Sequence, residues 1–318
     1  MEKPTVLLKK SRDFSDVINA TFAFISQEFK RYGKVMLYYG GIPILLSAIA
    51  GAFFSGTEMS RIFNQVGSME NSLEIFGVSY FLKIALVYIL SWLVFVFISG
   101  LTAAYMHLYT EKGRNGFEVN EVWQVFTSSI GKLMGFYLLT FLGFLVLGGG
   151  ISFVIASFSL VGSGDVVAAV TIFLAIVIFL VLVIYVSVPL SLGYVIIYSE
   201  KRSFGTLFSR MFQLVKGSWW QSFGVIFVLF LIYSLLSSLF SIPIFISSMM
   251  QGLVSATEGD VIGGDRFTFT MIVVSLIGTL GQFIMYPIIL IGVGVQYYNL
   301  REQKDNDSLL QKVAEMTE

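Results

Sequence analysis

Six long apolar runs constrain the fold of this 318-residue chain more than any other feature. A helix needs about 20 apolar residues to cross the ~30 Å hydrocarbon core of a bilayer. We place the spans approximately at residues 35–54, 78–105, 133–157, 166–197, 223–249 and 267–300. Charged residues make up 13% of the chain, whereas ordinary soluble domains contain about 25%. The sequence therefore predicts an all-α integral membrane bundle of six transmembrane helices, with residues 1–318 as a single membrane domain.

The basic residues predict the orientation of this bundle. Of the 20 Lys and Arg residues, only Arg61, Lys83 and Arg266 fall on one side of the predicted spans. The others lie in the N-terminal segment, the loops after spans two and four, and the polar segment after span six, which includes the tail at residues 305–318. Because cytoplasmic loops carry an excess of Lys and Arg, we expect a multi-pass protein of the bacterial inner membrane with both termini cytoplasmic. The charged N-terminus has no signal-peptide pattern.

Amphipathic helices are predicted beside three of the spans. From Phe204 to Val215 apolar residues recur at helical spacing, polar residues fill the other face, and Gly217 can end the helix. Similar stripes occur in residues 18–29 and 119–130. We expect three cytoplasmic interfacial helices whose apolar faces lie in lipid, with basic side chains among the headgroups. The candidate lipid or partner contacts are Phe22, Trp123, Phe208, Arg210, Phe212, Lys216, Trp219 and Trp220.

An internal repeat is indicated by the ends of the even-numbered spans. Span two ends in Tyr-Thr-Glu-Lys at residues 109–112, and span four ends in Tyr-Ser-Glu-Lys at residues 198–201. The apolar stripes that follow align at the same offset. We therefore predict a pseudo-threefold arrangement of helix-plus-hairpin units, approximately residues 14–112, 117–201 and 203–304. All three copies would have the same orientation in the membrane, unlike inverted-repeat transporters.

Few polar side chains lie inside the predicted spans, and two are candidate intramembrane polar residues. Lys83 lies near the outer end of span two, where its long stem can reach the headgroups; a buried functional cation is the alternative. Gln282 lies near the middle of span six, and an interhelical hydrogen bond is its simplest role. No Asp or Glu falls well inside a predicted span, which argues against proton- or ion-coupled carriers.

Small residues in the spans predict close helix packing or, as the alternative, a substrate groove. They include Gly278, Gly281 and the run Gly148 to Gly150, and small residues let helices approach closely in lipid. We also expect Pro189, Pro243 and Pro287 to kink spans four, five and six.

Composition excludes several kinds of chemistry. The chain has no Cys and one His, so thiolate and multi-His metal sites are excluded. Its formal net charge of zero argues against nucleic acid as a partner. No catalytic, cofactor-binding or metal-binding residues are predicted, and we expect no cofactor and no enzymatic activity.

A family resemblance rests on an early Phe-rich helix and on residues 210–220, which read Arg-Met-Phe-Gln-Leu-Val-Lys-Gly-Ser-Trp-Trp. The chain resembles bacterial six-span proteins, in particular the membrane domain beside some glycerophosphodiester phosphodiesterases and the YciC-like family. This resemblance implies a polytopic membrane module without an active site, because the phosphodiesterase chemistry belongs to a separate soluble domain.

These observations favour a non-enzymatic membrane protein that acts in membrane-complex assembly or lipid organisation. Its cytoplasmic amphipathic helices would form the contact surface for membrane lipids and for other membrane or cytoplasmic proteins. The alternative is a carrier of a lipid or apolar small molecule through a cavity between the hairpins. A cavity between spans that reaches Lys83 or Gln282 would favour the carrier, and a tightly packed bundle would favour assembly.

Overall fold

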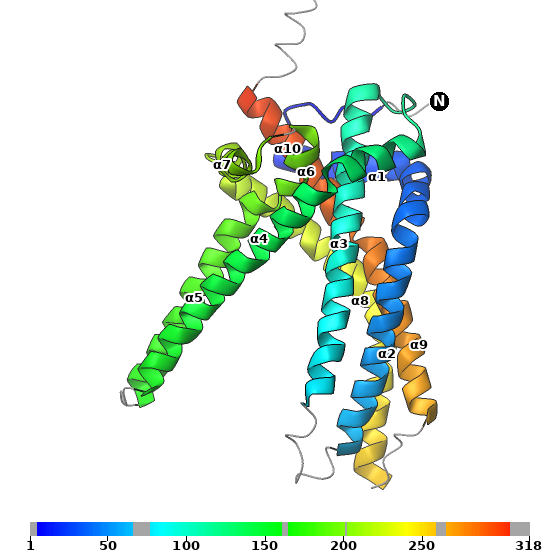
Figure 1. The fold of residues 1–318 in the computed structure, drawn as a ribbon, viewed down its shortest axis with the longest axis vertical. Helices are drawn as coiled ribbons and strands as arrows, with labels where there is room; N and C mark the ends of the chain where they lie inside the picture. The colour runs from blue at the N-terminus through cyan, green and yellow to red at the C-terminus, as the bar shows by residue number, and fades with distance from the viewer. Residues whose placement is uncertain (1–4, 66–76, 161–164, 201, 259–264, 306–318) are drawn as a thin grey trace, which may run out of the picture. The chain divides into compact units, whose positions relative to one another are not determined.

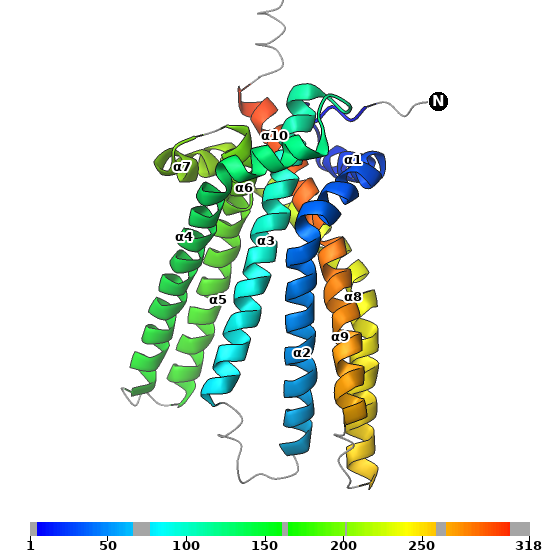
Figure 2. The same ribbon diagram turned by 45° about the vertical axis from the view of Figure 1, so that its right-hand side comes forward.

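The computed structural model describes residues 5–65, 77–160, 165–200, 202–258 and 265–305. These residues form α-helices and one π-helical turn, with no strand among them (Figures 1 and 2). Six helical stretches are long and apolar enough to cross a membrane: Phe14–Glu58, Val78–Lys112, Val119–Ser157, Ala169–Ser199, Trp219–Met250 and Arg266–Asp305. The structure therefore fits a multi-pass membrane protein.

The helices follow one another along the chain with short connections. Their bounds are α1 Phe14–Val35, η1 Met36–Gly40, α2 Gly41–Gln65, α3 Val78–Lys112, α4 Val119–Leu160, α5 Asp165–Leu190, α6 Gly193–Ser199, α7 Phe204–Val215, α8 Trp219–Glu258, α9 Asp265–Met285 and α10 Pro287–Asp305. The predicted tail after Asp305, and Lys201 of the predicted repeat junction, lie outside the described residues.

Two of the three predicted surface helices are not separate elements. Helix α1 continues beyond residue 29 and joins α2 through the π-helical turn η1. Pro43, which has no N–H to donate, follows this turn by three residues. Helix α4 runs without interruption from Val119 into the predicted third span. Only α7 is a helix of its own, flanked by residues 200–203 and by Gly217 with a φ of 84°.

The chain divides into two compact units, which we describe separately. The first unit consists of residues 1–20, 103–226 and 292–318, and the second of residues 21–102 and 227–291.

In the first unit α4 and α5 lie side by side as a hairpin, and α7 lies across its end (Figures 1 and 2). Helix α6 packs against α4 at Gly193, where an added Cβ would lie 2.3 Å from the Phe136 ring. The Tyr198 hydroxyl of α6 donates a hydrogen bond to the Phe126 carbonyl of α4, 3.1 Å away. The close contact at Gly193 therefore depends on the absence of a side chain.

In the second unit α2 and α9 lie side by side (Figures 1 and 2). A Cβ on Gly56 of α2 would lie 2.5 Å from Ile272 of α9. A Cβ on Gly281 of α9 would lie 2.1 Å from the Phe240 ring of α8. These contacts agree with the role of small residues in bringing membrane helices together.

The predicted close packing is confirmed at Gly278, whose Cβ would lie 2.8 Å from Ile244. It is wrong for the run Gly148 to Gly150, where an added Cβ would meet no atom within 4 Å. The glycine prediction therefore holds at Gly278 and Gly281 and fails at Gly148, Gly149 and Gly150, because residue size alone does not tell which helix faces are covered.

The apolar faces of α7 and of the start of α4 lie inside the first unit. Val122 and Phe126 of α4, and Leu207 and Met211 of α7, are almost completely buried. The prediction that these faces lie in lipid is therefore wrong for these residues, because neighbouring protein elements cover them. In α1, by contrast, Phe22 stays 37% exposed.

Candidate functional site

Arg210 lies at the centre of an ion-pair cluster in the first unit. Its Nε lies 3.1 Å and 3.0 Å from the two carboxylate oxygens of Glu200, which directly follows α6. Its terminal nitrogens bind both carboxylate oxygens of Asp305 at the end of α10. The Tyr297 hydroxyl and the Arg202 guanidinium also donate to Glu200, over 3.0 Å and 2.5 Å. Arg210 therefore ties α7 to the ends of two other helices.

The placement of Arg210 among lipid headgroups is wrong, because this residue is only 8% exposed. Burial acts to lower the pKa of its guanidinium, but the hydrogen bonds and charges of Asp305 and Glu200 outweigh burial, so the pKa is raised. A buried charge persists only with compensating partners, and these lie 10 and 95 residues away in sequence. Helical periodicity cannot show partners at such separations.

A second polar network, which the sequence did not predict, holds the N-terminal segment. The backbone N–H of Arg12 donates to the Asn299 side-chain oxygen over 2.7 Å, and its guanidinium binds the carbonyls of Leu7, Leu8 and Lys10. Asn299 donates in turn to the Gln296 side chain over 3.2 Å, and Gln296 donates to the Ser222 hydroxyl over 3.0 Å. Burial lowers the pKa of the Arg12 guanidinium, and the charge of Asp16 opposes that effect.

Trp219 compensates for a proline in the first unit. Pro189 has no N–H, so the Tyr185 carbonyl four residues earlier loses its helical donor. The Trp219 indole N–H donates to this carbonyl over 3.2 Å. The indole also stacks on the rings of Tyr185 and Phe223, with centroids 5.6 Å and 5.2 Å away. Trp219 is therefore an internal contact rather than a free surface anchor.

The other predicted contact residues differ in exposure. Trp220 is 79% exposed, Phe212 is 41% exposed, and Lys216 at the end of α7 is exposed. Trp123 and Phe208 are half-buried, with ring contacts to Phe126 and Phe136 respectively. Of the six predicted contacts near α7 and the start of α8, three remain well exposed: Phe212, Lys216 and Trp220.

Lys83 forms an ion pair in the second unit. Its ammonium lies 2.8 Å from the Glu58 carboxylate, and Glu58 is only 3% exposed. The predicted first span ends near residue 54, whereas α2 extends to Gln65 and holds the Glu58 carboxylate against α3. Glu58 is the last residue of the apolar stretch Phe14–Glu58, so it does not contradict the prediction that no Asp or Glu falls well inside a span.

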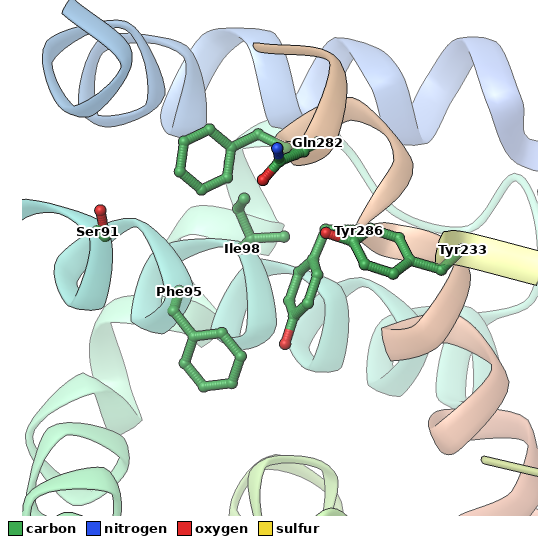
Figure 3. Close-up of a pocket in the computed structure, with 7 residues that line it drawn as sticks. Ser91, Phe95, Ile98, Tyr233, Gln282 and Tyr286 are labelled. Atoms are coloured by element: carbon green, nitrogen blue, oxygen red, sulfur yellow. The ribbon is translucent and has the colours of Figure 1, made fainter. Parts of the chain in front are cut away.

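Gln282, itself exposed, lines an open cavity at the surface of the second unit (Figure 3). The cavity has a volume of about 200 Å³. Its lining residues come from α3, α8, α9 and the break between α9 and α10: Ser91, Phe95, Ile98, Tyr233, Gln282, Phe283 and Tyr286. Its surface is mostly apolar. Lys83 is not among the lining residues, so only one of the two candidate intramembrane polar residues reaches the cavity.

Within the lining, aromatic rings contact one another. Phe95 and Tyr286 have ring centroids 5.6 Å apart, and Tyr233 and Tyr286 have theirs 5.8 Å apart. Ser91 also contacts α2, since its hydroxyl lies 3.3 Å from that of Ser47. The cavity is therefore lined mainly by aromatic and aliphatic side chains with a few polar groups, as is usual for small-molecule sites.

Among the described residues, no group of three His, Asp or Glu side chains is placed to hold a metal ion. No family model matches the chain, and comparisons with curated proteins and with solved structures found no match. The resemblance to the phosphodiesterase-associated membrane domain and to the YciC-like family stays a prediction.

Proposed function

We propose that this chain is a non-enzymatic protein of the bacterial inner membrane, with six spanning helices and both termini in the cytoplasm. It would act in the assembly of membrane complexes or in the organisation of lipids. The six long apolar helices support the membrane placement. The distribution of Lys and Arg along the chain supports the orientation.

The contact surface would consist of Phe212, Lys216 and Trp220, and their combined exposure carries the proposal. The opposite face of α7 is fixed by the burial of Met211 and by the ion pairs of Arg210. Exposed aromatic rings beside a Lys, at the start of a spanning helix, match the composition of a membrane interface. A fixed helix that presents such residues costs little ordering entropy on binding.

Two finer features belong to the same proposal. We infer that α1 and the start of α4 present interfacial surfaces as α7 does, in a threefold repeat of helix-plus-hairpin units. The exposed Phe22 supports the surface on α1. The shared Tyr-x-Glu-Lys ends of spans two and four support the repeat.

A matched pair of variants tests the contact surface. The triple variant Phe212→Ser, Lys216→Gln and Trp220→Ser removes its apolar and charged groups, while the control Thr206→Ala and Gln213→Ala changes exposed polar residues of the same helix. The full chain is purified natively, and mass spectrometry quantifies the proteins and lipids that copurify. We expect the triple variant to lose them and the control to keep them. Equal recovery from both variants would refute the contact surface.

A second candidate function, a carrier of a lipid or apolar small molecule, is favoured by the cavity at Gln282. We place it second, because about 200 Å³ is below the roughly 300–1,000 Å³ of pockets that enclose drug-sized ligands. Transfer of a fluorescent lipid between leaflets of proteoliposomes tests it. Transfer by the wild type that is lost in Ile98→Trp would support the carrier, and transfer equal to protein-free vesicles would exclude it for that lipid.

A further inference from the structure

The break between α9 and α10 changes the polar groups at the cavity. Helix α9 ends at Met285 and α10 begins at Pro287. The Tyr286 N–H still donates to the Gln282 carbonyl over 3.0 Å. Pro287 has no N–H to give to the carbonyl of Phe283, four residues earlier. Phe283 lines the cavity, so a backbone acceptor without its helical donor belongs to a residue of the cavity wall.

The first unit contains another backbone carbonyl that has lost its helical donor to a proline. There Pro189 removes the helical donor of Tyr185, and the Trp219 indole supplies a replacement N–H. Leaving a backbone carbonyl without a donor in an apolar surrounding costs about 1–3 kcal/mol. Phe283 and Tyr286, between which this carbonyl lies along the chain, both line the cavity, and a molecule bound there is the candidate donor.

The charge of the lining selects the kind of molecule. None of the seven lining residues is an Asp, Glu, Lys, Arg or His. A carboxylate, phosphate or ammonium group would enter without a counter-charge, which costs several kcal/mol in an apolar site. A neutral hydroxyl avoids this cost. It can donate one hydrogen bond to a carbonyl and accept one from the Gln282 amide or the Ser91 hydroxyl.

The size of the cavity limits what accompanies the hydroxyl. An apolar protein cavity of about 150 Å³ accepts benzene, so about 200 Å³ takes one ring or a short stretch of chain. The aromatic lining suits either, and the rest of a longer chain would leave toward the lipid. The bilayer is the natural source of such a molecule.

We propose that this cavity binds a neutral, membrane-soluble alcohol. Its hydroxyl donates to the Phe283 carbonyl and accepts from the Gln282 amide, while its adjoining hydrocarbon packs on Phe95, Tyr233 and Tyr286. This site is additional to the contact surface on α7, and its occupation does not require transport.

Photo-crosslinking of the purified full-length chain tests the proposal. The probe is octadecanol with a diazirine in its chain, and the comparison probes are octadecane and stearate with the same diazirine. We expect the alcohol to label peptides that contain residues 91–98 and 282–286 about three- to tenfold more than either comparison probe, which corresponds to one net hydrogen bond. Equal labelling by the alkane would refute recognition of the hydroxyl, and stronger labelling by stearate would refute the neutral-head assignment.

Three variants locate the site. Pro287→Ala returns an N–H to the Phe283 carbonyl and should lower alcohol labelling about three- to tenfold, the worth of one hydrogen bond. Gln282→Leu, at an exposed position that tolerates an apolar side chain, should lower it similarly, while Ile98→Trp should fill the cavity. The control Leu235→Trp, on α8 at a 70% exposed position, should label as the wild type does.

Labelling that survives both Pro287→Ala and Gln282→Leu would overturn the proposal, because the two groups assigned to the hydroxyl would then be irrelevant. Gln282→Leu keeps the test decisive if the buried-site variants fail to fold. The copurification experiment on α7 is scored on other residues and by another readout, so either conclusion can fail without the other.

Discussion

Removing the Arg210 side chain should destabilise the chain by about 2–4 kcal/mol. Breaking a buried ion pair by removal of one partner costs about 3–5 kcal/mol, and Arg210 and Glu200 have side chains 10% and 7% exposed. Two features reduce this figure. Asp305 is 30% exposed and thus partly hydrated, and Glu200 keeps the donors Tyr297 and Arg202.

Equilibrium unfolding of Arg210→Met in mixed detergent micelles, followed by circular dichroism, measures this loss. Arg210→Lys should fall between the variant and the wild type, because Lys keeps the charge but lacks the planar fork that binds two carboxylates. Arg202→Met is the control: its side chain is 41% exposed, and exposed ion pairs contribute about 0–1 kcal/mol. If Arg210→Met were as stable as the wild type, or lost no more stability than Arg202→Met, the assignment of Arg210 as a buried ion-pair partner that holds α7 to the two helix ends would be refuted.

Two further predictions concern stability. Trp219→Phe keeps the stacked ring but removes the donor to the Tyr185 carbonyl, so it should lower the free energy of unfolding by about 1–3 kcal/mol. In the double variant, Pro189→Ala should recover part of this loss, because it returns the helical N–H to the Tyr185 carbonyl. Strictly additive effects of the two substitutions on the free energy of unfolding would contradict the compensation. Gly281→Ala places a Cβ against the Phe240 ring and should lower the free energy of unfolding by about 1–3 kcal/mol through overpacking. Gly143→Ala is the control, because an added Cβ at Gly143 meets no atom within 4 Å. Equal unfolding midpoints of the two variants would show that the contact at Gly281 is absent.

The sequence predicted the number and approximate place of the long apolar helices, because hydrophobic length is a local property. It also predicted the interruptions near Pro189 and Pro287, where a missing N–H acts within one turn; α8, in contrast, continues through Pro243. The extension of α2 to Glu58 was missed because residues 55–65 are polar enough to read as a loop, and the partner Lys83 lies 25 residues further on.

The buried face of α7 shows where periodicity is ambiguous. The predicted apolar stripe comprised Phe204, Leu207, Phe208, Met211, Phe212 and Val215. The buried face shares Leu207, Met211 and Val215 with this stripe and adds Arg210 and Leu214. Arg210 and Leu214 lie three and seven residues after Leu207, which is also helical spacing, and that spacing was the one available signal for Arg210. A charged residue was assigned to the polar face because its two carboxylate partners come from distant parts of the chain.

The cavity could not be predicted at all beyond Gln282. Its lining joins residues from three helices and from the break between α9 and α10, and nothing local in the sequence relates Ser91, Tyr233 and Tyr286 to one another. Residue type indicated which side chain was unusual in a span, but only the packing of the helices shows that an unfilled volume lies beside it.

The most direct test of the account is a topology map by cysteine labelling. The natural chain has no Cys, so single substitutions at Ser11, Lys304 and Asp260 each report one position without background. In intact cells, a membrane-impermeant maleimide should label Asp260→Cys, and it should label Ser11→Cys and Lys304→Cys only after the membrane is opened. Labelling of Ser11→Cys but not Lys304→Cys in intact cells, or the reverse, would place the two chain ends on opposite sides of the bilayer and contradict the six-span account.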